Sequence, residues 1–486
     1  MNCIYRSIWN DKLGTYVAAA ENTASRGKSA SAGGGRLGAG AGLALQALTA
    51  AMLLGFGQGA HALPVGGVVA AGNAAISGGA GAMTVQQTSA RAVINWQGFS
   101  IGNGESVRFV QPDSSAVALN RVLGSDPSNI LGSLSANGRV FLVNPNGILF
   151  GPSAQVNVGG LVASTLNLTD GDFMAGRYRF AGSGGSVVNQ GSISADRGYV
   201  ALLGANVDNQ GVISANLGTV ALAAGSAVTL DMAGDGLLNV AVDQAAVHAL
   251  VENGGLIRAD GGQVVLSARS AGDLLQTVVN TSGVIQARSI ESRNGSIRLL
   301  GDMQTGAVKV GGALDVSGLA PGQTGGSVRI LAQAVDLAGA SINASGDAGG
   351  GTVLAGGNLQ GAGPEGNARR IALDGRTSIQ ADAIRAGNGG RIIVWADDSA
   401  AIDGTLSARG GAESGNGGLI ETSGKQLVLA DTTRVNTLAP QGKTGLWLLD
   451  PTNWTISGVG DETPGSVTTS LATSDRLIVA DNDITV

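Results

Sequence analysis

Cysteine is nearly absent from this sequence, since the only one among 486 residues is Cys3. The rest of the chain cannot form a disulfide, so apolar burial and backbone pairing must hold its fold. Histidine is also scarce, with two residues. No G-x-S-x-G, H-E-x-x-H or cysteine–histidine set occurs. We therefore expect no catalytic residue, no metal site and no cofactor.

Charged and aromatic residues are few, at 13% and 3% of the chain. The first 62 residues hold five of the 29 basic and two of the 35 acidic residues, which leaves a net charge of −9 on the remainder. No basic run occurs, and this argues against nucleic acid as a partner. Hydrophobic residues reach 43%, enough for a buried core rather than a disordered chain.

Glycine is abundant instead, with 81 residues, more than twice the usual share of about 7%. Much of it belongs to a phrase that recurs from residue 190 onward, Gly-x-Ile-x-Ala, then a turn, then Gly-x-Val-x-Leu. The first half begins at Gly191, Gly211, Gly255, Gly283 and, as Gly-Thr-Leu-Ser-Ala, at Gly404. The second half and its variants begin at Gly218, Gly262, Gly295, Gly326 and Gly390.

The apolar residues of this phrase alternate with period two, which indicates short strands rather than helices. A single strand of this kind cannot bury its apolar face, but stacked copies can. The pattern predicts an all-β chain that forms a right-handed parallel β-helix (a solenoid) with an N-terminal cap and extra-helical hairpins. The alternative is an antiparallel β-sandwich. No amphipathic helix is expected after residue 63.

The repeat also predicts the size of the coil and the content of its interior. The first two copies lie 20 residues apart, and coils of about 20 residues at about 4.8 Å each give on the order of 19 coils and a rod of about 90 Å between residues 63 and 445. Ala195, Ala215, Ala259 and Ala287 take the same place in successive copies, so we expect them to stack inside.

The first 62 residues have the composition of an export leader. Basic residues precede the apolar stretch Leu37–Phe56, and Ala60-His61-Ala62 follows it. This order is typical of a secretory signal peptide that is cleaved after Ala62. The alternative is a transmembrane anchor, because the stretch is nearly long enough to span a bilayer.

A polar and aromatic extension precedes the basic part of the leader. It begins Met1-Asn-Cys-Ile-Tyr-Arg-Ser-Ile-Trp-Asn10. This extension resembles the extended signal-peptide region of very large secreted proteins of Gram-negative bacteria. The resemblance implies export through the periplasm to the cell surface or the medium.

Between the leader and the repeat lies a segment with distinct motifs. Residues 140–143 and 148–150 read as strands, and Asn144-Pro145-Asn146-Gly147 between them has the preferences of a type I turn. With Ile148, this segment resembles the Asn-Pro-Asn-Gly-Ile motif of the two-partner secretion domain in the filamentous-haemagglutinin family.

Two further segments carry the same resemblance, Asn95-Trp-Gln-Gly-Phe-Ser-Ile101 and Gly159-Gly-Leu-Val-Ala-Ser-Thr165. They are more similar to the high-molecular-weight adhesins and the haem–haemopexin utilisation exoproteins than to filamentous haemagglutinin itself. The latter's second box, Asn-Pro-Asn-Leu, is absent, and Asp126-Pro-Ser-Asn129 stands nearby.

The resemblance implies a partner and a recognition site. In such proteins an outer-membrane β-barrel transporter of the two-partner secretion type recognises the domain, and the chain folds at the surface. The residues that match the motif are Asn144, Pro145, Asn146, Gly147 and Ile148. The alternative is that they serve the turn alone.

The resulting hypothesis has four regions. They are an extended signal peptide (1–62), a two-partner secretion domain that starts the β-helix (63–182), a β-helix repeat region (183–445) and the start of a further region (446–486). We expect an adhesin without a stable transmembrane segment in the mature chain, which binds a host cell surface.

Two other functions remain open. One is a haem/haemopexin-acquisition exoprotein, whose partner would be a haem carrier. The other is a carbohydrate-active β-helix enzyme, for which Asp397, Asp398 and Asp403 form the best local carboxylate cluster. We interpret these as solvated turn residues, and His248 as a packed residue.

Overall fold

The computed structural model describes residues 5–10, 15–20, 62–232, 237–272, 276–290 and 293–486. The chain divides into two units, residues 1–57 and residues 58–486. In the first unit, β1 (Tyr5–Asn10) pairs antiparallel with β2 (Thr15–Ala20). The apolar stretch Leu37–Phe56, Cys3 and the cleavage-site residue Ala60 lie outside the described residues.

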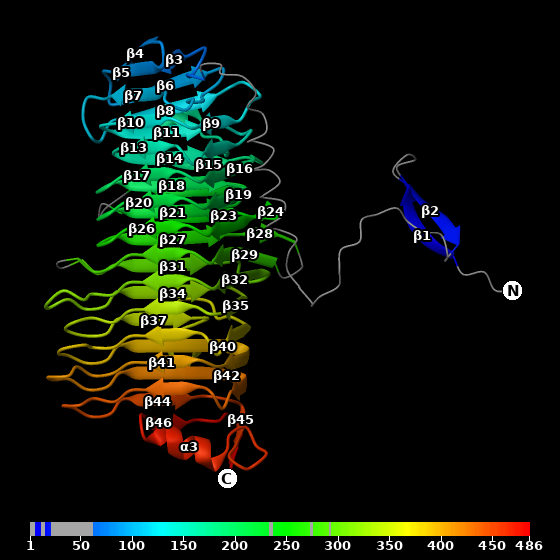
Figure 1. The fold of residues 1–486 in the computed structure, drawn as a ribbon, viewed down its shortest axis with the longest axis vertical. Helices are drawn as coiled ribbons and strands as arrows, with labels where there is room; N and C mark the ends of the chain where they lie inside the picture. The colour runs from blue at the N-terminus through cyan, green and yellow to red at the C-terminus, as the bar shows by residue number, and fades with distance from the viewer. Residues whose placement is uncertain (1–4, 11–14, 21–61, 233–236, 273–275, 291–292) are drawn as a thin grey trace. The chain divides into compact units, whose positions relative to one another are not determined.

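The second unit is a parallel β-helix whose coils stack one on the next (Figure 1). Each coil crosses three columns of parallel strands, here named face I, face II and face III. The strands of face I are β5 (Ala82–Gln87), β7 (Ser106–Val110), β10 (Ser133–Ala136), β13 (Gln155–Asn157), β17 (Ser192–Ser194), β20 (Val212–Ser214), β26 (Leu256–Arg258), β30 (Val284–Gln286), β33 (Ala313–Asp315), β36 (Ser341–Asn343), β39 (Ser378–Gln380), β41 (Thr405–Ser407) and β43 (Arg434–Asn436).

Faces II and III follow face I along each coil. Those of face II are β6 (Arg91–Trp96), β8 (Val117–Val122), β11 (Arg139–Val143), β14 (Gly160–Ser164), β18 (Tyr199–Gly204), β21 (Thr219–Ala224), β27 (Gln263–Ala268), β31 (Ser296–Leu300), β34 (Ser327–Leu331), β37 (Thr352–Ala355), β40 (Arg391–Ile402), β42 (Leu419–Leu429), β44 (Leu446–Leu449) and β46 (Asp475–Ile478). Those of face III are β9 (Ser128–Ile130), β12 (Ile148–Phe150), β16 (Ser186–Asn189), β19 (Asn206–Asn209), β25 (Leu250–Asn253), β29 (Gln276–Thr281), β32 (Gly306–Val310), β35 (Ala334–Leu337), β38 (Arg370–Leu373) and the second halves of β40 and β42.

The repeated phrase occupies the predicted place in this architecture. Its central isoleucines lie in register on face I, where Ile193 pairs with Ile213 and Ile213 with Ile257. The alanines that end the phrase are fully buried and stack inside, as expected. This inner column contains Ala195, Ala215, Ala259, Ala287, Ala344, Ala381 and Ala408. The prediction of a parallel β-helix is confirmed.

The glycine that opens each phrase is required by the close approach of neighbouring coils. A Cβ atom on Gly211 would lie 2.2 Å from the carbonyl oxygen of Gly191 in the coil before it. No side chain fits at that distance, because the conflict is with backbone rather than with a flexible side chain. The column of glycines is therefore a consequence of the close stacking of coils.

A buried ladder of polar side chains follows the end of face III. The Nδ2 atom of Asn189 donates to Oδ1 of Asn209 at 2.8 Å, and Nδ2 of Asn209 donates to Oδ1 of Asn253 at 2.8 Å. Asn253 continues the ladder to the Thr281 hydroxyl at 3.2 Å. Each amide satisfies the next, so burial of these groups costs little.

The predicted coil length of about 20 residues holds for part of the stack only. Val212 pairs with Ser192, 20 residues earlier, but also with Leu256, 44 residues later. Face I has 13 parallel strands from β5 to β43, so the expectation of 19 coils was wrong. At about 4.8 Å per strand the stack is about 60 Å long rather than 90 Å, because hairpins and long loops take up the remaining residues.

Extra-helical elements cover part of this β-helix. An antiparallel sheet of β15 (Tyr178–Ala181), β22 (Ala227–Asp231) and β23 (Asn239–Gln244), here named the hairpin sheet, packs with α2 (Asp170–Met174) over face II. At the N-terminal end, β3 (Val68–Ala71) pairs antiparallel with β6, and β4 (Ala74–Gly79) pairs antiparallel with β5. The cap and hairpins were expected.

The remaining elements are short. A two-stranded pair joins β24 (Ala246–Val247) to β28 (Ser270–Ala271), and the 3-10 helix η1 (Leu359–Gly361) lies in a loop beside β40. At the C-terminal end, β45 (Asn453–Thr455) pairs with β47 (Asp483–Thr485), and α3 (Pro464–Leu471) lies against β43. The helices α2 and α3 were not predicted, and no side chain of α3 is buried.

Candidate functional site

The Asn-Pro-Asn-Gly motif forms the corner between face II and face III. It joins β11 to β12, and the Gly147 amide donates to the Asn144 carbonyl at 3.2 Å, which closes the turn. Gly147 has φ of 125°, a conformation that other residues adopt only under strain. The tight turn expected from the sequence is therefore present.

The Asn144 side chain is fully buried and holds the corner together. Its Nδ2 atom donates to the Asp126 carbonyl and to the Ser128 hydroxyl, each at 3.0 Å. Its Oδ1 atom accepts from the Asn146 amide at 3.0 Å and from Asn146 Nδ2 at 3.1 Å. An amide can both donate and accept, so one residue fixes the preceding coil segment and its own turn.

The motif divides into a buried and an exposed part. Asn144, Gly147 and Ile148 are buried, whereas Pro145 and Asn146 are exposed. The Pro145 carbonyl accepts from the Gly185 amide at 2.9 Å in the following coil, and Asn146 Nδ2 donates to the Gly124 carbonyl at 2.9 Å. The two exposed residues are thus presented on a backbone that is pinned from both sides.

The other motif segments are structural in their geometry. Trp96 is buried, lies edge to face with Phe99 at 5.5 Å between ring centroids, and donates from Nε1 to Asn120 Oδ1 at 3.0 Å. Asn120 was not singled out by its sequence pattern. In Asp126-Pro-Ser-Asn129, Ser128 opens β9 and accepts from Asn144, so this segment supports the turn.

Of the two predicted cleavage-site alanines, only Ala62 belongs to the described residues. Its backbone amide donates to Oε2 of Glu105 at 3.0 Å, and the Gly102 amide donates to the same oxygen at 2.9 Å. Glu105 is 7% exposed. The N-terminal edge of the β-helix is thus held by a nearly buried carboxylate that the sequence reasoning missed.

The carboxylates suspected of catalysis do not converge. Asp397 accepts from Trp395 Nε1 and Asn367 Nδ2, each at 3.0 Å, while Asp398 pairs with Arg369 at 2.7 Å. Asp403 accepts from the Thr432 hydroxyl at 2.7 Å. Asp397 and Asp398 lie within β40 at a register shift rather than in a solvated turn, so that part of the interpretation was wrong.

The interpretation of His248 as a packed residue was also wrong. His248 is exposed at a turn and has φ of 55°. The local apolar run suggested burial, but the chain reverses there to bring Ala249 and Leu250 inward. Within the described parts of the chain, no group of three or more acidic, histidine or cysteine side chains has the arrangement of a metal site.

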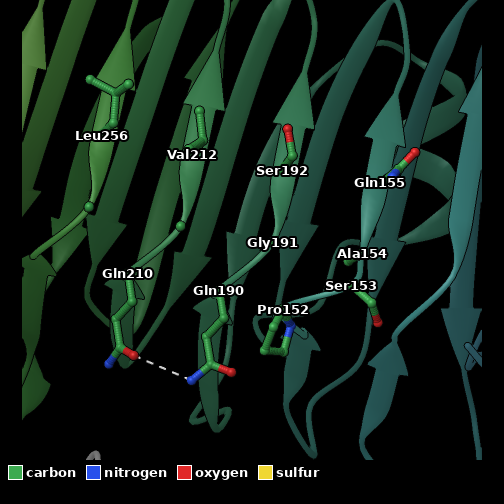
Figure 2. Close-up of a pocket in the computed structure, with 12 residues that line it drawn as sticks. Pro152, Ser153, Ala154, Gln155, Gln190, Gly191, Ser192, Gln210, Val212 and Leu256 are labelled. Atoms are coloured by element: carbon green, nitrogen blue, oxygen red, sulfur yellow. Dashed lines mark hydrogen bonds between the residues drawn. The ribbon is translucent and has the colours of Figure 1, made fainter.

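A shallow groove crosses face I over β13, β17, β20 and β26 (Figure 2). The Gln190 and Gln210 side chains lie side by side along it, and Nε2 of Gln190 donates to Oε1 of Gln210 at 3.3 Å. Its lining has neither charged nor aromatic side chains. Such a surface offers backbone and amide contacts but no group for acid–base chemistry.

The helices offer no membrane-crossing element in the regions that the structure describes, because none is both long and apolar enough. Comparison with known families gives two matches. Residues 60–316 match the TPS secretion domain, and residues 1–50 match the Extended Signal Peptide of Type V secretion system. The first covers more than half of the chain.

Relatives and a solved structure agree with these matches. Two heme/hemopexin-binding proteins of Haemophilus influenzae are 33% identical over 314 residues and 37% identical over 245 residues. These alignments cover 60% and 45% of this chain, but only 34% and 26% of those proteins. The chain thus spans about a third or less of the length of the curated relatives it matches.

The crystal structure of the HMW1 secretion domain from Haemophilus influenzae superposes with a TM-score of 0.69 at 31% identity, covering 80% of this chain and all of that one. The relatives are named for secretion and for binding rather than for catalysis. An extended signal peptide followed by this domain directs export to the cell surface or the medium, and the domain implies an outer-membrane transporter as partner. The chain belongs to the TPS secretion domain family and is a two-partner secretion exoprotein.

Proposed function

We propose that the outer-membrane transporter recognises the corner formed by Asn144–Ile148, with Pro145 and Asn146 as the contact residues. The single observation that carries the proposal is the division of the motif. Three of its residues are buried and shape the turn, and the two that remain are exposed on a pinned backbone. A preformed turn loses little conformational entropy on binding.

A neighbouring turn supplies a matched control. Gly151-Pro152-Ser153-Ala154 has its proline and the following residue exposed, and the Ala154 amide donates to the Gly151 carbonyl at 2.9 Å. This turn lies on the next corner of the same coil. It has the same pattern of exposed and buried residues and lies only seven residues further along the chain, but lacks the motif.

The experiment compares two double variants, co-expressed with the transporter. Pro145→Ala/Asn146→Ala should reduce the secreted fraction at least about tenfold, the effect of losing about 1.4 kcal/mol of recognition. Pro152→Ala/Ser153→Ala should leave secretion near the parent level. Equal secretion of the two variants would assign the motif to the turn alone.

A further variant separates contact from shape. Gly147→Val strains the backbone at φ of 125° and should reduce secretion as well. Hydrogen exchange of the purified variant should change only near this coil, because solenoid coils interact with their immediate neighbours. Loss of protection along the whole β-helix would mean that the secretion defect reflects general unfolding.

We also propose the signal cleavage between Ala62 and Leu63, after Ala60-His61-Ala62. The proposal is supported by the position of Ala62, whose amide donates to Glu105 at the edge of the β-helix. N-terminal sequencing or mass spectrometry of the secreted protein should begin at Leu63. The domain limits that we propose are 63–182 for the secretion domain, 183–445 for the repeat region, and 446 onward for a further region.

For the exported protein we propose adhesion to a host cell surface, with the β-helix as the display scaffold. Heme/haemopexin capture is the second candidate, because two relatives carry that name. Purified mature protein should bind host cells and not immobilised haemopexin if adhesion is correct. The opposite result would select the second candidate.

We propose no catalytic role for this chain. Asp397, Asp398 and Asp403 each engage a different partner, so they do not form the paired carboxylates that glycoside hydrolysis requires. Release of reducing sugar from a panel of polysaccharides, lost in an Asp397→Asn variant, would contradict this.

A further inference from the structure

A cavity of about 660 Å³ lies between face II and the hairpin sheet. Four of the residues that line it are arginines, namely Arg91, Arg139, Arg177 and Arg179, and one is acidic, Asp231. The chain as a whole carries a net charge of −6. A cavity with three more positive than negative side chains is therefore unlike the rest of the molecule.

The register of face II places two of these arginines in one column. Arg91 and Arg139 both pair with Val117, so they occupy the same position on β6 and β11, two coils apart. Arg139 is followed in this column by Gly160, and its guanidinium carbon lies 5.5 Å from the centroid of the Tyr199 ring beyond. The missing side chain at Gly160 leaves room for this approach.

The hairpin sheet and the residues before β15 form the outer wall of this open cavity. A Cβ atom on Gly176 would lie 3.0 Å from Nη2 of Arg91, so the backbone before β15 lies directly against that guanidinium. Arg177 and Arg179 follow in the next residues and are exposed at the rim. On the opposite side, Nη1 of Arg139 lies 3.7 Å from the Met232 sulfur.

These cations are only partly neutralised. Arg177 pairs with Asp172 at 2.8 Å, and at longer range Asp172 attracts Arg179 and Asp113 attracts Arg139. Across the described residues, no carboxylate lies within ion-pair distance of Arg91, Arg139 or Arg179, and the buried Nε of Arg91 has no hydrogen-bond partner. A guanidinium has five donors and no acceptor, so a buried one without an oxygen partner is unfavourable.

We propose that this cavity binds a phosphate group, with the Arg91 and Arg139 guanidinium groups as its inner donors and Arg179 at the rim. Guanidinium groups match a tetrahedral oxyanion with two donors each, and a dianion neutralises the excess charge. The group can belong to a soluble phosphate compound or to a phosphorylated lipid head group. This site goes beyond the secretion and display functions proposed above and does not depend on them.

The test uses the secreted mature protein and inorganic pyrophosphate as the probe, measured by calorimetry at low and at physiological salt. Arg139→Gln should raise the Kd at least about tenfold, because the phosphate loses the charged donors of one of its two inner guanidinium groups. Arg179→Gln should raise it several-fold. Arg108→Gln, an exposed arginine on face I, serves as the matched control and should leave it unchanged.

Vesicles distinguish the two sources of phosphate. Co-sedimentation with phosphatidylcholine vesicles that contain phosphatidate, without pyrophosphate binding, assigns a lipid head group, and the reverse assigns a soluble ligand. Binding of neither probe overturns the proposal. So does a Kd that is unchanged in both Arg139→Gln and Arg179→Gln. Arg179 is exposed, so its variant remains informative even if Arg139→Gln fails to fold.

Discussion

The coils between residues 91 and 268 and those between residues 296 and 449 share three faces but differ in what covers face II. In the first region, here named the covered region, the hairpin sheet and α2 lie over face II. A second apolar core, here named the outer core, forms between them and the outside of the β-helix. In the second region, here named the uncovered region, this second core is absent from the described residues: Arg298 is half-buried and Arg329 is exposed, although Leu354, Ile393 and Glu421 remain buried. A single column of paired residues makes the difference visible. It runs Phe141, Val162, Ala201, Ala221, Val265, Arg298, Arg329, Leu354, Ile393 and Glu421.

The corner between face I and face II also differs between the two regions, and here the second region has the additional residues. In the covered region it is a tight turn with one left-handed residue, Arg197, Leu217 or Gly261 in successive coils. In the uncovered region it widens into glycine-rich loops that bond to one another, as when the Ile384 amide donates to the Gly346 carbonyl at 2.9 Å. The inner column keeps small or apolar buried side chains, with Val316 and Thr437 in two coils in place of alanine, whereas each outer surface varies with what lies on it.

The largest loss of stability should come from burying a charge in the inner column, and it should be similar in both regions. Ala215→Asp and Ala408→Asp each place a charge at a fully buried position of the inner column, at a cost of several kcal/mol. Hydrogen exchange should show the affected coil and its neighbours unprotected in either variant. Val212→Asp, on the outward side of the same strand and 41% exposed, is the control and should leave protection intact. A protected Ala215→Asp coil would contradict the stacked interior.

Substitutions on the outward side of face II should destabilise the covered region much more than the uncovered one. Phe141→Ala removes a fully buried ring that contacts Phe173 and Tyr178, and should destabilise its coil by about 3–5 kcal/mol. Arg298→Ala, in the same column, should change stability by no more than about 0.5 kcal/mol, because partial burial of its guanidinium and the like charge of Arg329 oppose its packing and the attraction of Glu365. Chemical denaturation followed coil by coil measures both. Equal losses would mean that the hairpin sheet contributes nothing to face II.

Stability should depend on pH through two buried carboxyl groups, one in each region. Burial raises the pKa of Glu421 from 4.5 to about 7, and burial with the nearby Glu252 raises the pKa of Asp208 from 3.8 to about 6. The folded state binds the proton more tightly in each case, so stability falls as pH rises between the unfolded and folded pKa values. The fall should cover pH 4.5–7 for Glu421 and 3.8–6 for Asp208.

Replacing each carboxyl group by its amide tests the two pH ranges separately. Glu421→Gln should raise Tm at pH 8 and remove the upper window, and Asp208→Asn should remove the lower one. Thermal unfolding across pH 4–8 measures this. A parent Tm that rises through pH 5–7 because of Glu421 would reverse the sign argued here.

The smallest effect should come from the ion pairs at the widened corner. Arg385 pairs with Asp347 at 2.9 Å and Glu413 at 3.2 Å and is about half exposed. Arg385→Ala should cost less than about 1 kcal/mol and less still at high salt. Arg288→Ala removes the corresponding pair with Asp260 in the covered region, at 2.6 Å. A large loss at Arg385 alone would show that the stacked loops depend on it.

The repeat in the sequence was enough to predict the β-helix, but the cover over face II and the asparagine ladder were not predicted. The Gly-x-Ile-x-Ala phrase predicted face I and the stacked alanines because it repeats in register. A signal for the covered face was also present. Val200-Ala-Leu-Leu203 is apolar without alternation, which is typical of a strand buried on both sides. The asparagine ladder likewise has a signature, since Asn189, Asn209 and Asn253 each precede a phrase glycine by two residues.

The candidate site was predictable to a similar degree. The turn at Asn144–Gly147 follows from local residue preferences, whereas its burial by Asp126, Ser128 and Gly185 depends on neighbouring coils. The sequence could suggest the motif as a whole. It could not separate the exposed Pro145 and Asn146 from the rest.

Alternation, glycine spacing and the turn motif are local, so the chain alone specifies strands, corners and an inward face. The placement of Arg91 and Arg139 around one cavity, and the contact of Phe141 with Phe180, join residues that lie far apart in the chain. Which residues of different coils become neighbours depends on how many residues of each coil form hairpins and loops outside the stack. That number sets the register between coils, and register is a property of the folded stack because each strand finds its partner only when the coil before it is complete.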